Sequence, residues 1–133
     1  MLLQVVGYLW YGIIFNTDWM AEMQAVGLTV DVSSQSQTQS MILGVIVTLV
    51  MVLGMAWLIR RLGVTGLKGC VMTGLTAWFF FNLTTEALEY VYMGFTPTLM
   101  AINVGDQLLS FVVAGAALTM VKFGQSADNA IAA

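Results

Sequence analysis

The chain has 133 residues, of which 59% are hydrophobic and only 8% are charged, and it contains no histidine. This composition lies outside the range of soluble globular proteins, so we expect a protein that exposes most of its surface to lipid. Without histidine the chain lacks the commonest metal ligand and the commonest general base, and we predict no metal site, no cofactor and no catalysis. Four basic residues and a net charge of -3 also give no phosphate-binding patch for nucleic acid.

The first element that the sequence predicts is a membrane helix over residues 1–17. No charged region precedes its apolar run and no cleavage pattern follows it, so we interpret it as an anchor rather than a signal peptide. The apolar part would rise only about 22 Å, less than a hydrocarbon layer of roughly 30 Å, so either the helix continues or the membrane thins locally. Trp10, Tyr11 and Trp19 are aromatic residues of the kind that anchor a helix at the membrane interface.

A short interfacial helix is predicted next, over residues 18–28. Four apolar residues recur here at helical spacing, and two carboxylates are expected on the opposite face. The apolar set is Trp19, Met20, Met23 and Val26, and the acidic pair is Asp18 and Glu22. This pattern is typical of a helix that lies in the plane of the lipid headgroups.

The strongest membrane signal covers residues 41–59, a run without a charged residue that ends at two arginines. A helix that is apolar on every side is typical of a membrane span, because no small soluble domain could bury it. Residues 31–40 before it are rich in serine and glutamine and show no apolar periodicity. We therefore predict an exposed loop there, with Thr38 or Ser40 capping the helix that follows.

Two further membrane helices are predicted over residues 67–92 and 98–121. Gly94 and Pro97 lie between them and should break the helix, because proline lacks the amide proton that a helix interior needs. With the two earlier spans these helices predict an all-α fold, an integral membrane bundle of four transmembrane helices with a short interfacial helix after the first. We expect the bundle to be a single domain over residues 1–133.

All four basic residues fall on one side of this bundle. Arg60, Arg61 and Lys68 lie around the second connection, and Lys122 follows the last helix. Because arginine and lysine are enriched in cytoplasmic loops, this side is expected to face the cytoplasm, together with both termini. Most of the acidic residues fall toward the opposite side.

A polar face is predicted near the outer end of the third membrane helix. Asn82, Glu86 and Tyr90 are spaced by four residues, with Glu89 beside them, so they should share one side of the helix. The fourth helix carries a similar stripe at spacings of three and four, made of Asn103, Asp106, Gln107 and Ser110. We expect the two stripes to face each other.

Carboxylates at this depth need an explanation, because an ionisable group inside a bilayer costs at least a few kcal/mol unless it is hydrated, paired or protonated. No basic residue lies at this level. One hypothesis is a small cation site or proton relay. Its residues would be Asn82, Glu86, Glu89, Tyr90 and Asp106. The alternative is that both glutamates lie among hydrated headgroups, while the aspartate bonds across the helix pair to Asn82, Thr85 or Tyr90.

Small residues four apart recur on three of the predicted helices. The pairs are Gly44 with Thr48, Cys70 with Gly74, and Gly115 with Thr119. Such pairs allow helices to approach closely, either within the bundle or between the bundle and a partner. Cys70 is the only cysteine, and we interpret it as a small packing residue because it has no second cysteine to pair with.

The opening of the chain follows the spacing W-Y-x-x-x-F-x-x-x-W-M, made of Trp10, Tyr11, Phe15, Trp19 and Met20. This spacing resembles the opening of a bacterial membrane protein family, domain of unknown function 1761. The resemblance covers nearly the whole chain and implies four membrane helices, a polar stretch after the first, an acidic residue late in the third and an I-N-x-G-like start to the fourth. The matching residues are Glu89, Ile102, Asn103 and Gly105. The chain differs from the family at residues 16–18, where glycine and a basic residue are frequent, and the resemblance implies no reaction.

These features favour a small non-catalytic protein of the bacterial inner membrane. It would be an accessory or structural subunit that packs against itself as a homo-oligomer or against a larger membrane complex. An alternative is a small oligomeric cation or proton translocator that uses the acidic cluster. A third hypothesis is a protein that binds a lipid or pigment against Trp78 and residues 79–81.

Overall fold

All regular structure in the described part of the chain is helical, which confirms the all-α prediction. The computed structural model describes residues 2–27 and 34–121. In chain order the elements are α1 (Leu2–Leu9), η1 (Trp10–Ile14), α2 (Asn16–Ala25), α3 (Ser34–Arg61), α4 (Gly66–Ala77), η2 (Trp78–Asn82), α5 (Leu83–Met93) and α6 (Pro97–Leu118). The elements labelled η are short π-helical segments, whose backbone hydrogen bonds span five residues instead of four.

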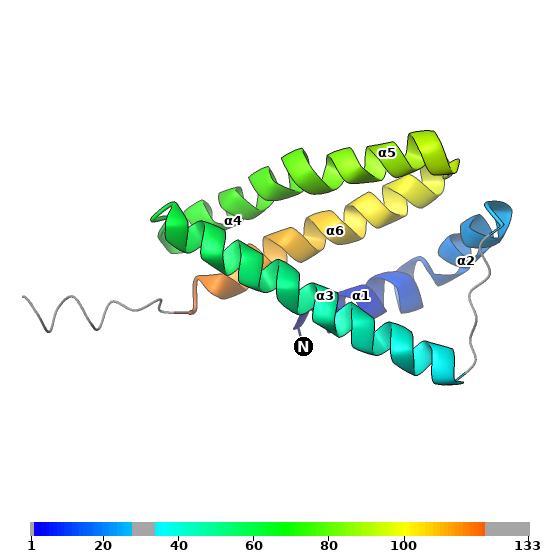
Figure 1. Ribbon diagram of the computed structural model, residues 1–133, viewed down its shortest axis with the longest axis horizontal. Helices are drawn as coiled ribbons and strands as arrows, with labels where there is room; N and C mark the ends of the chain where they lie inside the picture. Colours follow the sequence, from blue (N-terminus) through cyan, green and yellow to red (C-terminus); the bar gives the residue numbers. More distant parts are fainter. Residues whose placement is uncertain (1, 28–33, 122–133) are drawn as a thin grey trace, which may run out of the picture.

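The central helix of the fold is α6 (Figure 1). The elements α4, η2 and α5 follow one another as a single rod, and α6 returns antiparallel along this rod. On the other side of α6 lies α1, while α3 crosses at an angle and packs near the end of α6. Because the other helices all contact α6, its side chains have the most opportunity to meet residues from distant parts of the chain.

Glycines with left-handed backbones make the two tight connections. Gly63 (φ 62°) and Gly66 (φ 77°) lie between α3 and α4, and Gly94 (φ 72°) follows α5. α6 then begins with Pro97, and the hydroxyl of Thr96 caps it by accepting a hydrogen bond from the backbone N–H three residues later at 3.1 Å. The predicted break between the last two long helices is therefore confirmed.

Two glycines bring α4 and α6 into backbone contact. A Cβ atom at Gly74 would lie 2.6 Å from the carbonyl oxygen of Phe111, and one at Gly115 would lie 2.7 Å from the carbonyl oxygen of Cys70. Cys70 is also buried in the core cluster that joins α3, α4 and α6. Three of the predicted small residues thus take part in packing within the chain.

The other three predicted small residues make no comparable contact within the described ranges. Nothing would lie within 4 Å of a Cβ atom at Gly44. The hydroxyl of Thr48 accepts a hydrogen bond from Nε2 of Gln4 at 3.0 Å and donates one to the Gly44 carbonyl at 2.8 Å. The hydroxyl of Thr119 donates to a carbonyl of its own helix at 2.6 Å. Contact of these residues with a partner stays a prediction.

The helix α3 is longer than predicted. It begins at Ser34, so the prediction of a loop over residues 31–40 is wrong from residue 34 onward, and residues 28–33 lie outside the described part. Thr38 and Ser40 lie inside the helix and do not cap it. No glycine or proline interrupts the polar segment and glutamine is a good helix former, so the helix of the apolar run extends back through it.

The first predicted helix is divided in two. Phe15 takes a non-helical conformation (φ -112°, ψ 16°) after η1, and α2 restarts at Asn16. A helix is therefore present here, but it starts and ends earlier in the chain than predicted, and its position at the membrane interface stays a prediction. The prediction that Glu22 opposes its apolar face is wrong, because Glu22 is partly buried and accepts a hydrogen bond from the hydroxyl of Thr96. α2 thus packs against the beginning of α6.

Two helices are long and apolar enough to cross a membrane, Thr38–Arg61 and Pro97–Leu118. The third predicted span is observed as the continuous rod over residues 66–93, in which η2 separates two shorter α-helices. The first apolar helix, Leu2–Ile14, is shorter. Of the four predicted membrane spans, the second and the fourth are therefore single helices long and apolar enough to cross a membrane, and the first and the third are not.

The end of the last helix differs slightly from its prediction. α6 ends at Leu118, whereas the sequence predicted residue 121. Met1 and Lys122, which belonged to the predicted first helix and the predicted basic side, lie outside the described part of the chain.

Candidate functional site

Two hydrogen bonds attach the first helix to the first half of α6. The indole Nε1 of Trp10 donates to the backbone carbonyl of Ile102 at 2.9 Å. The hydroxyl of Tyr11 donates to Oδ1 of Asn103 at 3.2 Å. Because both acceptors lie about one helical turn before Asp106, η1 is held beside that carboxylate.

This attachment depends on Gly105. A Cβ atom at this position would lie 2.6 Å from Cζ2 of the Trp10 ring, so a side chain there would displace the indole. The Trp10 ring also packs on Phe15 with 4.8 Å between ring centroids, and Tyr11 packs on Trp19 at 5.3 Å. The aromatic residues predicted to anchor the interface therefore have a role within the chain, and their anchoring role stays a prediction.

Asp106 is the only buried carboxylate among the described residues, with 7% of its surface exposed. Its Oδ1 atom has no hydrogen-bond partner. Tyr11 lies close enough to both Asp106 and Glu86 to interact with them electrostatically. The tyrosine from the first helix is therefore shared between acidic residues on α5 and α6.

The rod of α4, η2 and α5 contributes three residues spaced by four, Trp78, Asn82 and Glu86. Each is partly buried and has one buried polar atom without a hydrogen-bond partner, namely the indole Nε1, the amide Oδ1 and the carboxylate Oε2. With Oδ1 of Asp106 these make four such atoms on elements that pack together. Since buried polar groups in folded proteins are nearly always hydrogen-bonded, these four atoms are available to bind a further group.

We call this group, Tyr11, Trp78, Asn82, Glu86 and Asp106, the carboxylate site. Among its four unpartnered atoms, three are acceptors and one is a donor. A bound species that only accepts hydrogen bonds would leave most of them unsatisfied. The site therefore suits a species that donates hydrogen bonds or carries positive charge.

No basic side chain compensates these carboxylates in the part of the chain that the structure describes. Arg60, Arg61 and Lys68 lie around the connection between α3 and α4, at the far end of the rod from α5 (Figure 1). The nearest charged neighbour is acidic, because Glu89 interacts electrostatically with Glu86. Partly buried like charges without a counter-ion are unfavourable unless protonation or a bound cation offsets them.

Both π-helical segments lie at the carboxylate site, since η1 contains Tyr11 and η2 runs from Trp78 to Asn82. A π-helical segment adds a residue to one helical turn, which changes which side chains face a neighbouring helix, and such segments are frequent at functional sites. The first and last residues of η2 are partly buried, while the three phenylalanines between them are exposed. The hypothesis of lipid or pigment binding at these aromatic residues stays a prediction.

Two threonines stabilise the backbone of η2. The hydroxyls of Thr84 and Thr85 donate to the carbonyls of Phe80 and Phe81 at 2.8 and 2.7 Å. Carbonyl groups in a widened turn are less well satisfied by the backbone alone, so these bonds favour the π-helical geometry.

Of the five predicted site residues, Glu86 and Asp106 both lie near Tyr11, and Asn82 precedes Glu86 by one turn of the same rod. Glu89 lies one turn beyond Glu86 and interacts with it electrostatically. Tyr90 does not share their burial, because 40% of its side chain is exposed. Residues four apart drift by about 40° for each step around a helix of 3.6 residues per turn, so the third member of the series leaves the shared face.

The alternative prediction for the aspartate is not observed. Among the described residues, Asp106 forms no hydrogen bond with Asn82, Thr85 or Tyr90. The hydroxyl of Thr85 is instead bonded within its own helix. The interaction that would have given Asp106 a purely structural role is therefore missing.

Tyr11 and Trp78 were not predicted as members of the site. The first was predicted to lie at the membrane interface and the second on an aromatic surface. The available signal was chemical, because a tryptophan or tyrosine in an apolar helix needs a partner for its polar atom when it is buried. The sequence carried no signal that η1 would bring Tyr11 next to Asp106.

Comparison with known proteins gives one match. The model of a family described as "Protein of unknown function (DUF1761)" matches residues 1–119, which include the whole carboxylate site. No curated protein and no solved structure matches the chain significantly. Five of the residues that carried the resemblance make the contacts between η1 and α6 described above; they are Trp10, Tyr11, Ile102, Asn103 and Gly105.

Proposed function

The chain belongs to the family of proteins of unknown function DUF1761, and we propose that it is a multi-pass protein of the bacterial inner membrane that binds and passes a proton or a small monovalent cation. The observation that carries this proposal is Asp106, a buried carboxylate with an unpartnered oxygen and no basic residue beside it. An intramembrane ionisable residue of this kind is usually part of an ion or proton path.

The proposed topology has four spans. α3 and α6 meet the length and hydropathy required of a membrane helix. At about 1.5 Å per residue the rod of α4, η2 and α5 is also long enough for roughly 30 Å of hydrocarbon. The first apolar helix, Leu2–Ile14, would need local thinning of the membrane.

The proposed orientation follows from charge. Arg60, Arg61 and Lys68 gather around the connection between α3 and α4, which the positive-inside rule assigns to the cytoplasm. The acidic residues of α2 and α5 lie toward the other end of the bundle (Figure 1). Both termini would then be cytoplasmic.

The composition of the carboxylate site supports a proton or a monovalent cation as its ligand. Its oxygen ligands come from two carboxylates, one amide and one phenol. A bound cation, or a proton on either carboxylate, would offset negative charge that no described basic residue beside the site neutralises.

Access to the site is favoured from the outer end. Ser110, one turn after Asp106 on α6, is also buried and extends the polar path toward the cytoplasmic side. Beyond it the backbones of α4 and α6 touch at Gly74 and Gly115, which leaves no room for a hydrated ion. We propose that this conformation is closed to the cytoplasm and that transport requires α4 and α6 to separate.

The test is flux in proteoliposomes. The wild type should carry protons or a monovalent cation above the level of empty liposomes, and Asp106→Asn should abolish this flux without changing assembly. Asp18→Asn is the matched control, because it removes one carboxylate from an exposed position on α2. Wild-type flux in the Asp106→Asn protein, or no flux in the wild type, would reject the proposed function.

The exposed surface of α3 favours a second candidate, a structural subunit that associates with a copy of itself or a larger complex. Only 11% of its most apolar window is buried within the chain, compared with 33% for α6. Cysteine cross-linking tests this candidate. If α3 packs on the α3 of a second copy, Gly44→Cys in a Cys70→Ser background should form a disulfide-linked dimer. Tyr92→Cys in the same background places the cysteine on α5 and is the control, which should form no such dimer.

A further inference from the structure

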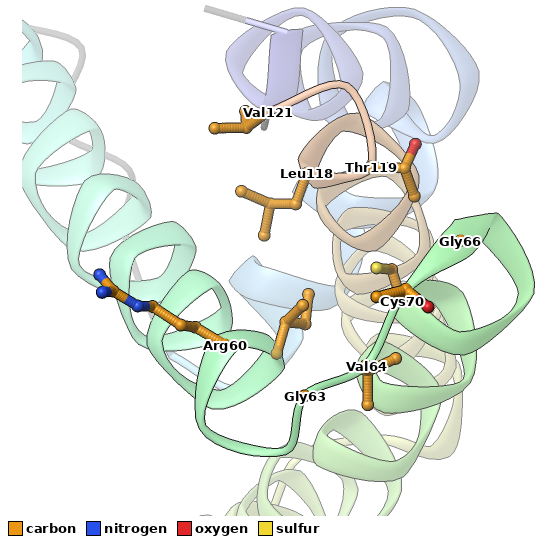
Figure 2. Close-up of a pocket in the computed structure, with 10 residues that line it drawn as sticks. Arg60, Gly63, Val64, Gly66, Cys70, Leu118, Thr119 and Val121 are labelled. Atoms are coloured by element: carbon orange, nitrogen blue, oxygen red, sulfur yellow. The ribbon is translucent and has the colours of Figure 1, made fainter. Parts of the chain in front are cut away.

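A cavity of about 400 Å³ lies at the opposite end of the bundle from the carboxylate site (Figure 2). The end of α3 and the following turn form one wall, with Arg60 and Val64, and the start of α4 contributes Cys70. Figure 2 shows the Arg60 side chain extending away from Cys70, so its guanidinium group lies at the edge of the cavity. Leu118 and Val121, at and just after the end of α6, close the other side. Arg60 also lines an adjoining hollow of about 370 Å³ with Trp57 and Arg61.

The positive charge around this cavity is not neutralised by the described residues. Within residues 2–27 and 34–121, Arg60, Arg61 and Lys68 form no hydrogen bond and no ion pair. All three side chains are exposed, and the described carboxylates lie on α2, α5 and α6. A cavity lined by an unpaired arginine, with two further bases nearby, complements an anion in charge.

The polarity of the walls narrows the choice of anion. Besides Arg60, the polar side chains that line the cavity are the hydroxyls of Thr65 and Thr119 and the thiol of Cys70. The hydroxyl of Thr65 makes no cap hydrogen bond with α4, so it is available to a ligand. The remaining walls are apolar and are formed by Ile59, Val64, Leu118 and Val121. A fully hydrated inorganic ion would leave this apolar surface without a partner, whereas a lipid carries a phosphate and hydrocarbon together.

We propose that one anionic phospholipid binds at this cavity, with its headgroup phosphate at the edge of the cavity and Arg60 as the principal contact. A guanidinium group can hold two phosphate oxygens at once, and Thr65 can donate a further hydrogen bond. The apolar walls receive the glycerol end of an acyl chain. Basic pockets between membrane helices on the cytoplasmic side suit such headgroups. The proposal rests on the proposed membrane topology and is independent of ion flux.

The experiment measures lipid retention by native mass spectrometry. The full chain is purified in a non-ionic detergent and offered phosphatidylglycerol or phosphatidylcholine at equal concentration. The wild type should retain one phosphatidylglycerol in preference to phosphatidylcholine. Arg60→Gln should weaken this retention by about tenfold, the loss expected for one charge-assisted contact. Arg60→Lys, which keeps the charge but loses the planar fork, should fall between them.

Lys68→Gln is the matched control, because it removes one positive charge from the same end of the bundle but does not line the cavity. It should leave the single bound lipid in place. Equal losses in Lys68→Gln and Arg60→Gln would overturn the proposal in favour of diffuse surface charge. Equal retention of the zwitterionic lipid, or displacement of phosphatidylglycerol by excess inorganic phosphate, would also overturn it. Far-UV circular dichroism checks that each variant is folded. The ion flux of wild type and Asp106→Asn is measured in a separate experiment, so that failure of the flux proposal can be told apart from failure of the lipid proposal.

Discussion

The indole ring of Trp10 occupies the space that a side chain at position 105 would fill. A Cβ atom at Gly105 would lie 2.6 Å from Cζ2 of that ring, and the same indole donates its hydrogen bond to α6 one turn earlier. Because Gly105 has no side chain, η1 can lie close against α6 at this position. Because η1 lies this close to α6, the hydroxyl of Tyr11 can donate its hydrogen bond to Asn103. Tyr11 also lies near the carboxylate of Asp106.

Gly105→Ala should destabilise the fold by about 1–3 kcal/mol, because the added methyl group forces the Trp10 ring away and breaks its bond to Ile102. The measurement is thermal unfolding in detergent, followed by circular dichroism. Gly54→Ala is the control, since nothing lies within 4 Å of a Cβ atom there and alanine favours a helix. A Gly105→Ala protein as stable as the control would show that the indole moves at no cost.

Tyr11→Phe should cost about 0.5–1.5 kcal/mol, because it removes the hydrogen bond to Asn103 and leaves the amide oxygen without its donor. The clean measurement is a double-mutant cycle with Asn103→Ala, in which the two losses should not add. Tyr92→Phe serves as the control, since 81% of that side chain is exposed. Additive losses in the cycle would contradict a direct interaction between Tyr11 and Asn103.

Much of this arrangement follows from patterns that the sequence contains. The uncharged run before Arg60, the break at Gly94 and Pro97, and the spacing of Asn82 and Glu86 predicted the long helices and the acidic face. These features depend on period and composition, which local sequence records well.

Other features could not be predicted, because they depend on small energy differences resolved by tertiary contact. A single π-helical turn shifts the spacing of apolar residues in a helix by only one residue. The positions of η1 and η2 therefore cannot be recognised from the hydrophobic periodicity of the sequence. The polar start of α3 looked like a loop because its residues are hydrophilic, although serine and glutamine tolerate a helix that an apolar run already stabilises. Tyr90 was assigned to the site by a spacing that drifts around the helix.

Gly74→Ala should be more damaging than Gly105→Ala, because the new methyl group would meet a backbone carbonyl instead of a side chain that can move. Its Cβ would lie 2.6 Å from the carbonyl oxygen of Phe111. We expect a loss at the upper end of about 1–3 kcal/mol, measured by the same thermal unfolding. Gly44→Ala is the matched control on α3, where the added methyl group meets nothing within 4 Å.

The comparison of Gly74 with Gly44 also bears on assembly. If Gly44→Ala leaves the stability unchanged but weakens a dimer seen by sedimentation in detergent, the small-residue face of α3 is used between copies. Equal stability of Gly74→Ala and the wild type would contradict the backbone contact between α4 and α6.

Asp106→Asn should raise the thermal stability of the protein while it abolishes ion flux. Asparagine has nearly the same shape, carries no charge that needs a counter-ion, and offers two N–H donors to a site whose other unpartnered acceptors are the oxygens of Asn82 and Glu86. We expect a gain of about 1 kcal/mol, as is common when a strained functional group is replaced by one that fits its surroundings. Asp18→Asn, on the exposed side of α2, should change neither property. Loss of stability in Asp106→Asn would mean that the carboxylate holds the fold together, and its burial would then no longer support a functional role.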